Sequence, residues 1–227
     1  MLISDSHRFV FLHNPKAAGT SVRSVLEKYD STAGKFWRNF DDRVRLRDMA
    51  HMPMESVREF FPTEFEKLSL YFVFGFVREP LSRYISGFNE INKQIYLGLR
   101  SGQISIENYR ERLKRHTDKL LSKPCELCPF VHCIPQHLIY CIGDECHADL
   151  IMKIEDPLQF KQSLIGGIGE PAEVLFSNLI DPARRRNVKK LDYQLNELLC
   201  KDQFDGLVSY YSRDFKDLGY EVPVYHS

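Results

Sequence analysis

The chain has 227 residues, of which 43% are hydrophobic and 27% charged, so it can bury the core of a folded domain and is too apolar for a disordered chain. Its 31 Lys and Arg balance its 31 Asp and Glu, which argues against a nucleic-acid-binding protein, because that class usually carries a basic excess. No stretch reaches the roughly 18 apolar residues of a membrane span, and no apolar signal-peptide core follows Met1. We therefore expect no nucleic-acid partner and no transmembrane segment in this chain.

The N-terminal residues predict a strand, a loop and a helix in succession. Residues 8–13 form a short apolar run, which is typical of a buried strand. Residues 14–19 are loop-forming, and Thr20 and Ser21 then precede apolar residues at helical spacing as far as Tyr29.

A second strand, loop and helix follow after a polar, irregular stretch at residues 31–50. Residues 54–61 predict a short helix that Pro62 ends. Residues 70–77 are the strongest strand signal in the chain, and an amphipathic helix begins at Pro80, where a first helical turn tolerates proline.

The remaining elements continue this alternation of strands and helices. It favours an α/β fold with a central, mostly parallel sheet flanked by helices, and we expect a single P-loop-like domain over residues 1–227. The later segments are predicted as helices at 105–121, 156–164 and 191–215, and as strands at 138–142 and 150–154.

The first motif is the loop at residues 13–21. A loop between a strand and a helix N-terminus offers free backbone N–H groups and the positive end of the helix dipole, both of which favour an anion. It differs from the standard nucleotide loop because Lys16 precedes Gly19, which disfavours a kinase or other NTP-using enzyme. The alternative is an ordinary turn with a capping Ser or Thr. The residues expected to surround a phosphate are Lys16, Ala17, Ala18, Gly19, Thr20 and Ser21.

The second motif spans residues 76–88. Arg78 ends the strongest strand, where ligands of open α/β sheets bind. Ser86 lies about two helical turns later, so both side chains could reach one phosphate. The alternative is an Arg that pairs with a carboxylate and a Ser that packs inside a helix.

Together the two motifs resemble the 5′-phosphosulfate and 3′-phosphate loops of the sulfotransferases that use 3′-phosphoadenosine-5′-phosphosulfate (PAPS). The match is closer to the carbohydrate-type branch, which includes the uronosyl 2-O-sulfotransferases. The resemblance extends over most of residues 8–221 and is strong only at the two loops. The matching residues are Pro15, Lys16, Thr20 and Ser21 in the first motif and Phe76, Val77, Arg78, Pro80, Arg83 and Ser86 in the second.

This resemblance implies that the chain moves a sulfuryl group from PAPS to a hydroxyl, with a carbohydrate as the suggested acceptor and adenosine 3′,5′-bisphosphate as the product. It assigns Lys16 to the leaving 5′-phosphate oxygen, and Thr20 and Ser21 to the same phosphate. Arg78 and Ser86 are assigned to the 3′-phosphate.

The general base is expected to be His51, because this branch places its catalytic His between the two loops. Histidine is the usual base near neutral pH. The alternative is a surface or capping His. His13 is a competing candidate for the base, although it could instead pack against the loop. Glu55 and Glu79 are weaker candidates, which are considered because Glu is the base in other sulfotransferase branches.

Five of the six cysteines cluster between residues 125 and 146. Free thiols are the expected state, and no metal is included in the predicted site. A zinc site is an alternative, with ligands drawn from Cys125, Cys128, Cys133, His132 and His137. A Cys141–Cys146 disulfide is another if the chain meets an oxidising compartment.

The basic run at residues 183–190 is either a solvated face or a loop that grips an anion. The variable segments 31–50 and 92–135 are expected to shape the acceptor site.

Two other functions stay open beside the sulfotransferase, namely a P-loop kinase or NTP-using enzyme and a non-catalytic nucleotide-binding module. The expected location is the cytoplasm, or the Golgi lumen if the chain is the catalytic fragment of a membrane-anchored enzyme. The sequence does not indicate an oligomeric state.

Overall fold

The computed structural model describes residues 1–37, 39, 41, 43, 49–123, 130–180, 193 and 195–226. Its contacts divide the chain into two compact units. The expectation of one domain over the whole chain stays a prediction. The first unit comprises Met1–Arg78 and Gln136–Asn187, and the second comprises Glu79–Pro135 and Val188–Ser227.

The first unit is built on a four-stranded sheet with the order β1-β2-β3-β6. β1 (Leu2–Ser4) runs antiparallel to β2 (Phe9–Leu12), while β3 (Phe72–Val77) is parallel to both β2 and β6 (Leu150–Lys153). The predicted α/β class with a mostly parallel central sheet is therefore confirmed. β1 was not predicted, because three residues are too few to show a periodic pattern.

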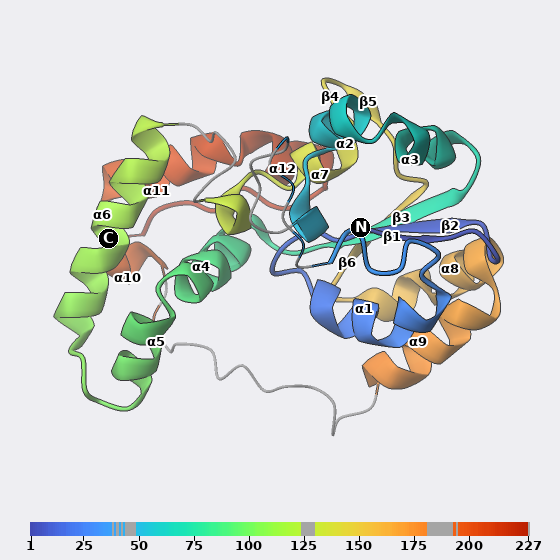
Figure 1. The fold of residues 1–227 in the computed structure, drawn as a ribbon. Coiled ribbons are helices and arrows are strands. Elements are labelled where there is room, and N and C mark those ends of the chain that lie inside the picture. The colour runs from blue at the N-terminus through green and yellow to red at the C-terminus, as the bar shows by residue number, and fades with distance from the viewer. Residues whose placement is uncertain are drawn as a thin grey trace. The chain divides into compact units, whose positions relative to one another are not determined.

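Helices cover both faces of this sheet (Figure 1). One face carries α1, α8 and α9, whose apolar residues pack against the phenylalanines of β2 and β3 in one core cluster. α2, α3 and α7 lie on the other face. The bounds are α1 Gly19–Leu26, α2 Met54–Phe60, α3 Pro62–Glu66, α7 His137–Tyr140, α8 Lys161–Ile168 and α9 Glu170–Ile180.

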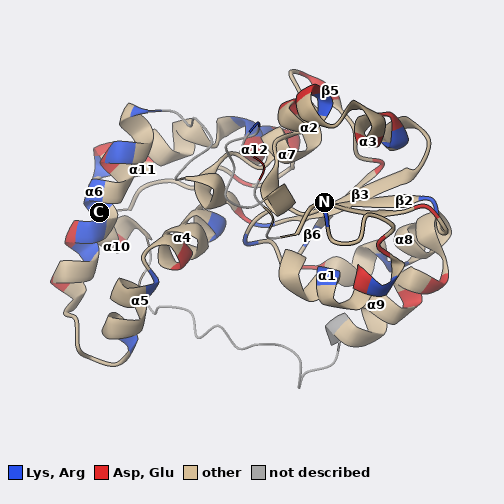
Figure 2. Cartoon of the chain, in the orientation of Figure 1, with Lys and Arg blue, Asp and Glu red and all other residues tan. Residues whose placement is uncertain are grey.

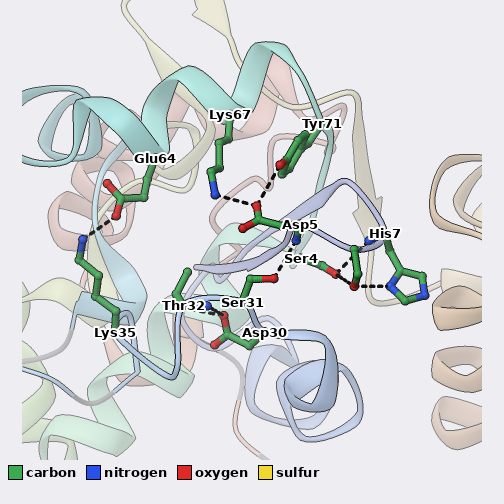
Figure 3. A network of polar contacts seen from close by, with 11 residues as sticks. Ser4, Asp5, His7, Asp30, Ser31, Thr32, Lys35, Glu64, Lys67 and Tyr71 are labelled. Carbon is green, nitrogen blue, oxygen red and sulfur yellow. Dashed lines mark hydrogen bonds and ion pairs between the residues drawn. The ribbon is translucent and has the colours of Figure 1, made fainter.

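The turn between β1 and β2 is tied to neighbouring segments by polar contacts (Figure 3). The carboxylate of Asp5 accepts hydrogen bonds from Lys67 Nζ at 2.6 Å and from the Tyr71 hydroxyl at 2.9 Å, and the Asp5 backbone N–H donates to Ser31 Oγ at 2.8 Å. The Lys67 hydrogen bond holds the pKa of Asp5 below its usual value. These contacts attach the turn after β1, the strand at one edge of the sheet, to the segments around it.

A small hairpin follows α7. Its strands β4 (Cys141–Ile142) and β5 (Glu145–Cys146) pair antiparallel, and a disulfide joins Cys141 to Cys146 across them. The predicted strand at 138–142 is wrong over its first part, because residues 137–140 form a helical turn. A short apolar run does not distinguish a strand from a buried helix.

The second unit is helical and has its own core, which includes Tyr84, Tyr109, Leu113 and Tyr211. Its longest helix, α6, confirms the helix predicted at 105–121. The bounds are α4 Pro80–Ile91, α5 Lys93–Arg100, α6 Ile106–Ser122, α10 Leu195–Leu198, α11 Lys201–Tyr210 and α12 Ser212–Asp217.

The helix predicted at 54–61 is confirmed by α2, which ends before Pro62, whereas a later predicted boundary is wrong. Pro62 itself begins α3, because a proline at the first helical position sacrifices no hydrogen bond. The continuous helix predicted at 191–215 is divided, within the described residues, at Cys200, whose backbone is extended, and at Tyr211. No helix in the described part of the chain is both long and apolar enough to cross a membrane.

Candidate functional site

The loop after β2 has an unusual backbone. Lys16 and Ala18 have φ angles of 64° and 60°, in the left-handed region that residues with a side chain rarely adopt. This conformation costs about 1–2 kcal/mol per non-glycine residue. Left-handed residues within a turn direct neighbouring N–H groups toward one point, which makes a concave site for an anion.

The helix that follows leaves its first N–H groups available. Ala18 is the N-cap of α1 and makes no capping hydrogen bond with its side chain, and the first turn contains no acidic residue. The first N–H groups of a helix have no acceptor within the helix. Ala18, Thr20 and Ser21 are exposed here, so an incoming anion would meet the positive end of the helix dipole and two hydroxyl groups.

Gly19 is required by close packing. A Cβ atom built on Gly19 would lie 1.8 Å from Cδ2 of His13, so the imidazole occupies the space of a side chain. The buried His13 ring stacks with both Phe11 and Trp37, at centroid distances of 5.8 and 5.6 Å. His13 therefore packs against the loop, which was the alternative to a role as the base.

His51 lies beside this loop. It ends a 3-10 turn at Met49–His51, is buried, and its ring centroid is 4.6 Å from that of His13. Its Nδ1 is 3.1 Å from the carbonyl oxygen of His13. Because a carbonyl oxygen can only accept, Nδ1 carries the hydrogen, and a neutral His51 has its lone pair on Nε2. The candidate base and the candidate phosphate loop are thus brought together within the first unit.

A buried amide links the loop to the end of β3. Asn14 Nδ2 donates to the Phe76 carbonyl at 3.0 Å and to Oε1 of Gln136 at 2.8 Å. The same Oε1 accepts the backbone N–H of Arg78 at 3.0 Å, and Gln136 Nε2 donates to the Arg78 carbonyl at 2.8 Å. Gln136 is completely buried. This arrangement fixes the backbone of Arg78 relative to the first loop.

Sequence reasoning did not single out Asn14 or Gln136 as site residues. A Gln in a segment remote from both loops carries no local signal, because its partners are identified only once β2 and β3 pair in parallel. The Asn after the first strand was a weak signal, since Asn at a strand end is common in turns.

The other candidates divide between the two units. Ser86 is half-buried on α4 in the second unit. Glu79 is the N-cap of α4 and accepts from the N–H groups of Leu81 and Ser82 at 2.9 and 2.6 Å, which occupies its carboxylate. Glu55 is exposed and pairs with Arg58 at 2.5 Å. Both carboxylates are therefore engaged in contacts outside the first loop.

Arg83, which matches the second motif, has a structural role in the second unit. Its guanidinium is fully buried and donates to the carbonyl oxygens of His132 and Ile134. It also lies 5.7 Å from the ring centroid of Tyr211.

The cysteine and basic segments are only partly described. Cys125, Cys128 and the basic run at 184–190 lie outside the described residues, so the predictions about zinc and about an anion-gripping loop stay predictions. Within the described residues, no three His, Cys, Asp or Glu side chains gather around a common point that could hold a metal ion. Cys133, which is buried, and Cys200, which is exposed, form no disulfide within the described residues.

Comparison with known proteins gives two matches. A model of the sulfotransferase family matches residues 1–221. Carbohydrate sulfotransferase 14 of Danio rerio is 30% identical over 90 residues, which cover 39% of this chain and 23% of that protein. The match therefore spans less than a quarter of the curated relative. No solved structure matches the chain significantly.

Proposed function

The chain belongs to the sulfotransferase family, and from this premise we propose that it transfers a sulfuryl group from PAPS to an acceptor hydroxyl with His51 as the general base. The observation that carries the proposal is the contact of His51 with the loop. Its Nδ1 bonds the carbonyl of His13, the residue at which the loop begins. A proton acceptor thus lies next to a backbone arranged for an anion.

The residues present fit the 5′-phosphosulfate group. The left-handed backbone at Lys16 and Ala18 and the uncapped start of α1 provide N–H donors, and no acidic side chain in the first turn opposes a negative charge. Lys16 adds a full positive charge, and Thr20 and Ser21 add hydroxyl donors. Ala17 and Gly19 complete the loop, in which the space beside Gly19 is filled by His13.

The 3′-phosphate is assigned to Arg78 and Ser86. Gln136 supports the assignment of Arg78, because it holds the backbone N–H and C=O of this residue at the end of β3. Arginine matches the geometry of a phosphate with two parallel hydrogen bonds. The assignment of Ser86 rests on the sequence resemblance alone.

Sulfuryl transfer requires that the two substrates are positioned, that one proton is removed from the acceptor and that the charge on the leaving phosphate oxygen is stabilised. His51 Nε2 takes the proton of the acceptor hydroxyl as the acceptor oxygen forms its bond to sulfur. The bond between sulfur and the phosphate oxygen breaks on the opposite side, and Lys16 balances the negative charge that develops on this oxygen. Adenosine 3′,5′-bisphosphate leaves with the bonding electrons.

A carbohydrate is the proposed acceptor, because the curated relative is a carbohydrate sulfotransferase. The location is proposed to be a lumenal compartment such as the Golgi, instead of the cytoplasm. The Cys141–Cys146 disulfide supports this choice, since disulfides form and persist in oxidising compartments.

The proposal is tested with PAPS that carries radioactive sulfur in its sulfuryl group, incubated with a panel of polysaccharides. We expect label on at least one polysaccharide with the native protein. The variant His51→Ala should bind adenosine 3′,5′-bisphosphate normally and transfer label at least about a hundredfold more slowly, the lower range for a lost acid–base group. Transfer by this variant at the native rate would exclude His51 as the base. Donor binding without transfer to any polysaccharide would favour the non-catalytic module.

A further inference from the structure

A cavity of ≈ 240 Å³ lies beside α6 in the second unit, and none of its lining residues is one assigned above to the donor or the base. Three cationic side chains line it, namely Arg112, Arg115 and Lys119. They lie on one side of α6, at a spacing that brings residues of successive turns together. Figure 2 shows Lys and Arg recurring along this helix.

Two of these cations are not neutralised by the described residues. Arg112 Nε donates to Asn92 Oδ1 at 2.9 Å, which orients the guanidinium and leaves its terminal nitrogen atoms for another acceptor. No carboxylate in the described part of the chain pairs with Arg112 or Lys119. Arg115 has only an exposed contact with Glu111 at 3.4 Å, a kind of pair that contributes little. The cavity therefore favours a negatively charged occupant.

His116 also lines the cavity, and its hydrogen positions follow from its neighbours. Thr117 Oγ1 donates to the Leu113 carbonyl at 2.9 Å, so its only hydrogen is used. The Tyr84 hydroxyl, 2.8 Å from Thr117 Oγ1, must then donate to Thr117. The same hydroxyl is 3.2 Å from His116 Nδ1 and has no second hydrogen, so His116 donates from Nδ1.

His116 consequently presents an acceptor at Nε2. Burial, and secondarily the charges of Arg112 and Lys119, lower its pKa to about 4, which keeps the ring neutral near pH 7. Nε2 is buried and no hydrogen-bond partner within the described residues reaches it. Within the described residues, a lone pair without a donor thus lies beside two cations, Arg112 and Lys119, that have no carboxylate partner. This arrangement is complementary to an anion that also carries a hydroxyl.

The rest of the wall is apolar. The ring of Phe130 packs edge-on against His116 at a centroid distance of 5.1 Å, and Ile91 lines the same cavity. An apolar wall suits the C–H face of a small ring better than an inorganic ion. The volume lies below the roughly 300–1,000 Å³ of pockets for drug-sized ligands, so the occupant is small.

We propose that this cavity is a binding site for a small hydroxycarboxylate of the sugar-acid class. Its carboxylate would lie on Arg112 and Lys119, and one hydroxyl would donate to Nε2 of His116. The site goes beyond the proposed sulfotransfer, since it uses other residues and its occupancy is measured without turnover.

The test is calorimetric titration of the intact protein, saturated with adenosine 3′,5′-bisphosphate, with glucuronate as the probe. Glucose lacks the carboxylate and acetate lacks the hydroxyl, and we expect each to bind about tenfold or more weakly than glucuronate. Equal binding of the three probes, or no binding of glucuronate, overturns the proposal. Inorganic phosphate that binds more tightly than glucuronate would show a simple anion site and would overturn it too.

Two variants on α6 separate the interactions. His116→Asn keeps a donor for Tyr84 in the place of Nδ1 and removes Nε2. It should lower the affinity for glucuronate about tenfold and leave the affinity for acetate unchanged. Lys114→Ala removes a positive charge from the same helix at a position outside the cavity lining, and should change neither probe.

A measurement on the native protein keeps the test independent of variant stability. The ring nitrogen resonances of His116 report whether Nε2 accepts a hydrogen bond. Glucuronate should shift the Nε2 resonance and glucose should not. An unchanged Nε2 resonance at saturating glucuronate contradicts the assigned contact.

Discussion

At the level of single residues, the contact between His13 and Gly19 determines how closely the first loop packs. The imidazole occupies the position of a side chain on Gly19, so the loop can close only around a residue without a Cβ atom. The same ring contacts His51, whose Nδ1 bonds the His13 carbonyl. A change at Gly19 should therefore disturb both the phosphate loop and the base.

We predict that Gly19→Ala lowers the melting temperature and weakens binding of adenosine 3′,5′-bisphosphate, because the new methyl group would meet His13 at 1.8 Å. The matched control is Gly166→Ala in α8, where a Cβ atom meets nothing within 4 Å. The control should raise stability by roughly 0.5–1 kcal/mol, the helix preference of Ala over Gly. Differential scanning calorimetry with and without the bisphosphate measures the melting temperature of each variant and its increase on binding. Equal melting temperatures and equal increases in the two variants would contradict the role given to Gly19.

The half-buried imidazole of His116 leads to a prediction about the pH dependence of stability. Its pKa is about 4 in the folded protein and 6.5 in the unfolded chain, so between these values the unfolded state binds more protons and folding stability falls as the pH is lowered. The slope for this group is at most about 1.4 kcal/mol per pH unit. Above pH 6.5 and below pH 4 the group adds no further change.

Urea unfolding of native protein and His116→Asn between pH 7 and pH 4 checks this slope. The native free energy of unfolding should fall more steeply, because Asn does not titrate while the acidic residues titrate in both proteins. Parallel curves for the two proteins would show that folding does not lower the pKa of His116.

At the level of secondary-structure elements, side chains around α7 join the segments that follow the parallel strands β2 and β3. Gln136 precedes α7, yet it bonds the loop after β2 and the residue after β3. Tyr140, at the end of the same helix, donates to the Phe76 carbonyl at 2.8 Å. Gln136 and Tyr140 thus connect the first loop with the end of β3, although neither was assigned to PAPS or to the base.

The variant Gln136→Leu has a similar size and leaves Asn14 Nδ2 and the Arg78 N–H without their shared acceptor. We expect it to lose about 1–3 kcal/mol of stability and to bind adenosine 3′,5′-bisphosphate more weakly. Gln136→Glu keeps the accepting oxygen and should recover part of both losses. Gln162→Leu, an exposed change on α8, should stay within about 0.5 kcal/mol of native in chemical denaturation. Native affinity in Gln136→Leu would contradict a positioning role.

The elements with a local signal were predictable from the sequence. β2 and β3 are apolar runs, and the strand, loop and helix order around residues 13–21 and 76–88 follows from spacing and loop-forming residues. α5 and α9 were not predicted, and the helix expected at 156–164 continues to Ile168 after a 3-10 turn at Pro157–Phe160. Boundaries of this kind depend on tertiary packing as well as local preference.

The contacts within the site could not be predicted, because they join residues remote in the chain. His13 against Gly19, His51 against the His13 carbonyl, and Gln136 between Asn14 and Arg78 all require the folded sheet. A motif indicates which residue types are present, whereas the position of a Gln or of a His ring depends on the packing around it.

At the scale of the whole molecule, the two compact units have separate cores. The first core packs α1, α8 and α9 on the sheet, and the second packs α4, α6 and α11 on one another. The family match runs through both units, over residues 1–221. The candidate donor loop and base belong to the first unit, while Ser86 and the cationic cavity belong to the second.

Calorimetric titration with adenosine 3′,5′-bisphosphate tests whether the chain recognises this part of PAPS. We predict saturable binding with one site, strong loss of affinity in Lys16→Ala and Arg78→Ala, and no change in Arg100→Ala, an exposed control on α5. Adenosine 5′-monophosphate, which lacks the 3′-phosphate, should bind the native protein weakly and be insensitive to Arg78→Ala. A folded native protein that does not bind the bisphosphate, or that prefers ATP with Mg²⁺, would contradict the account.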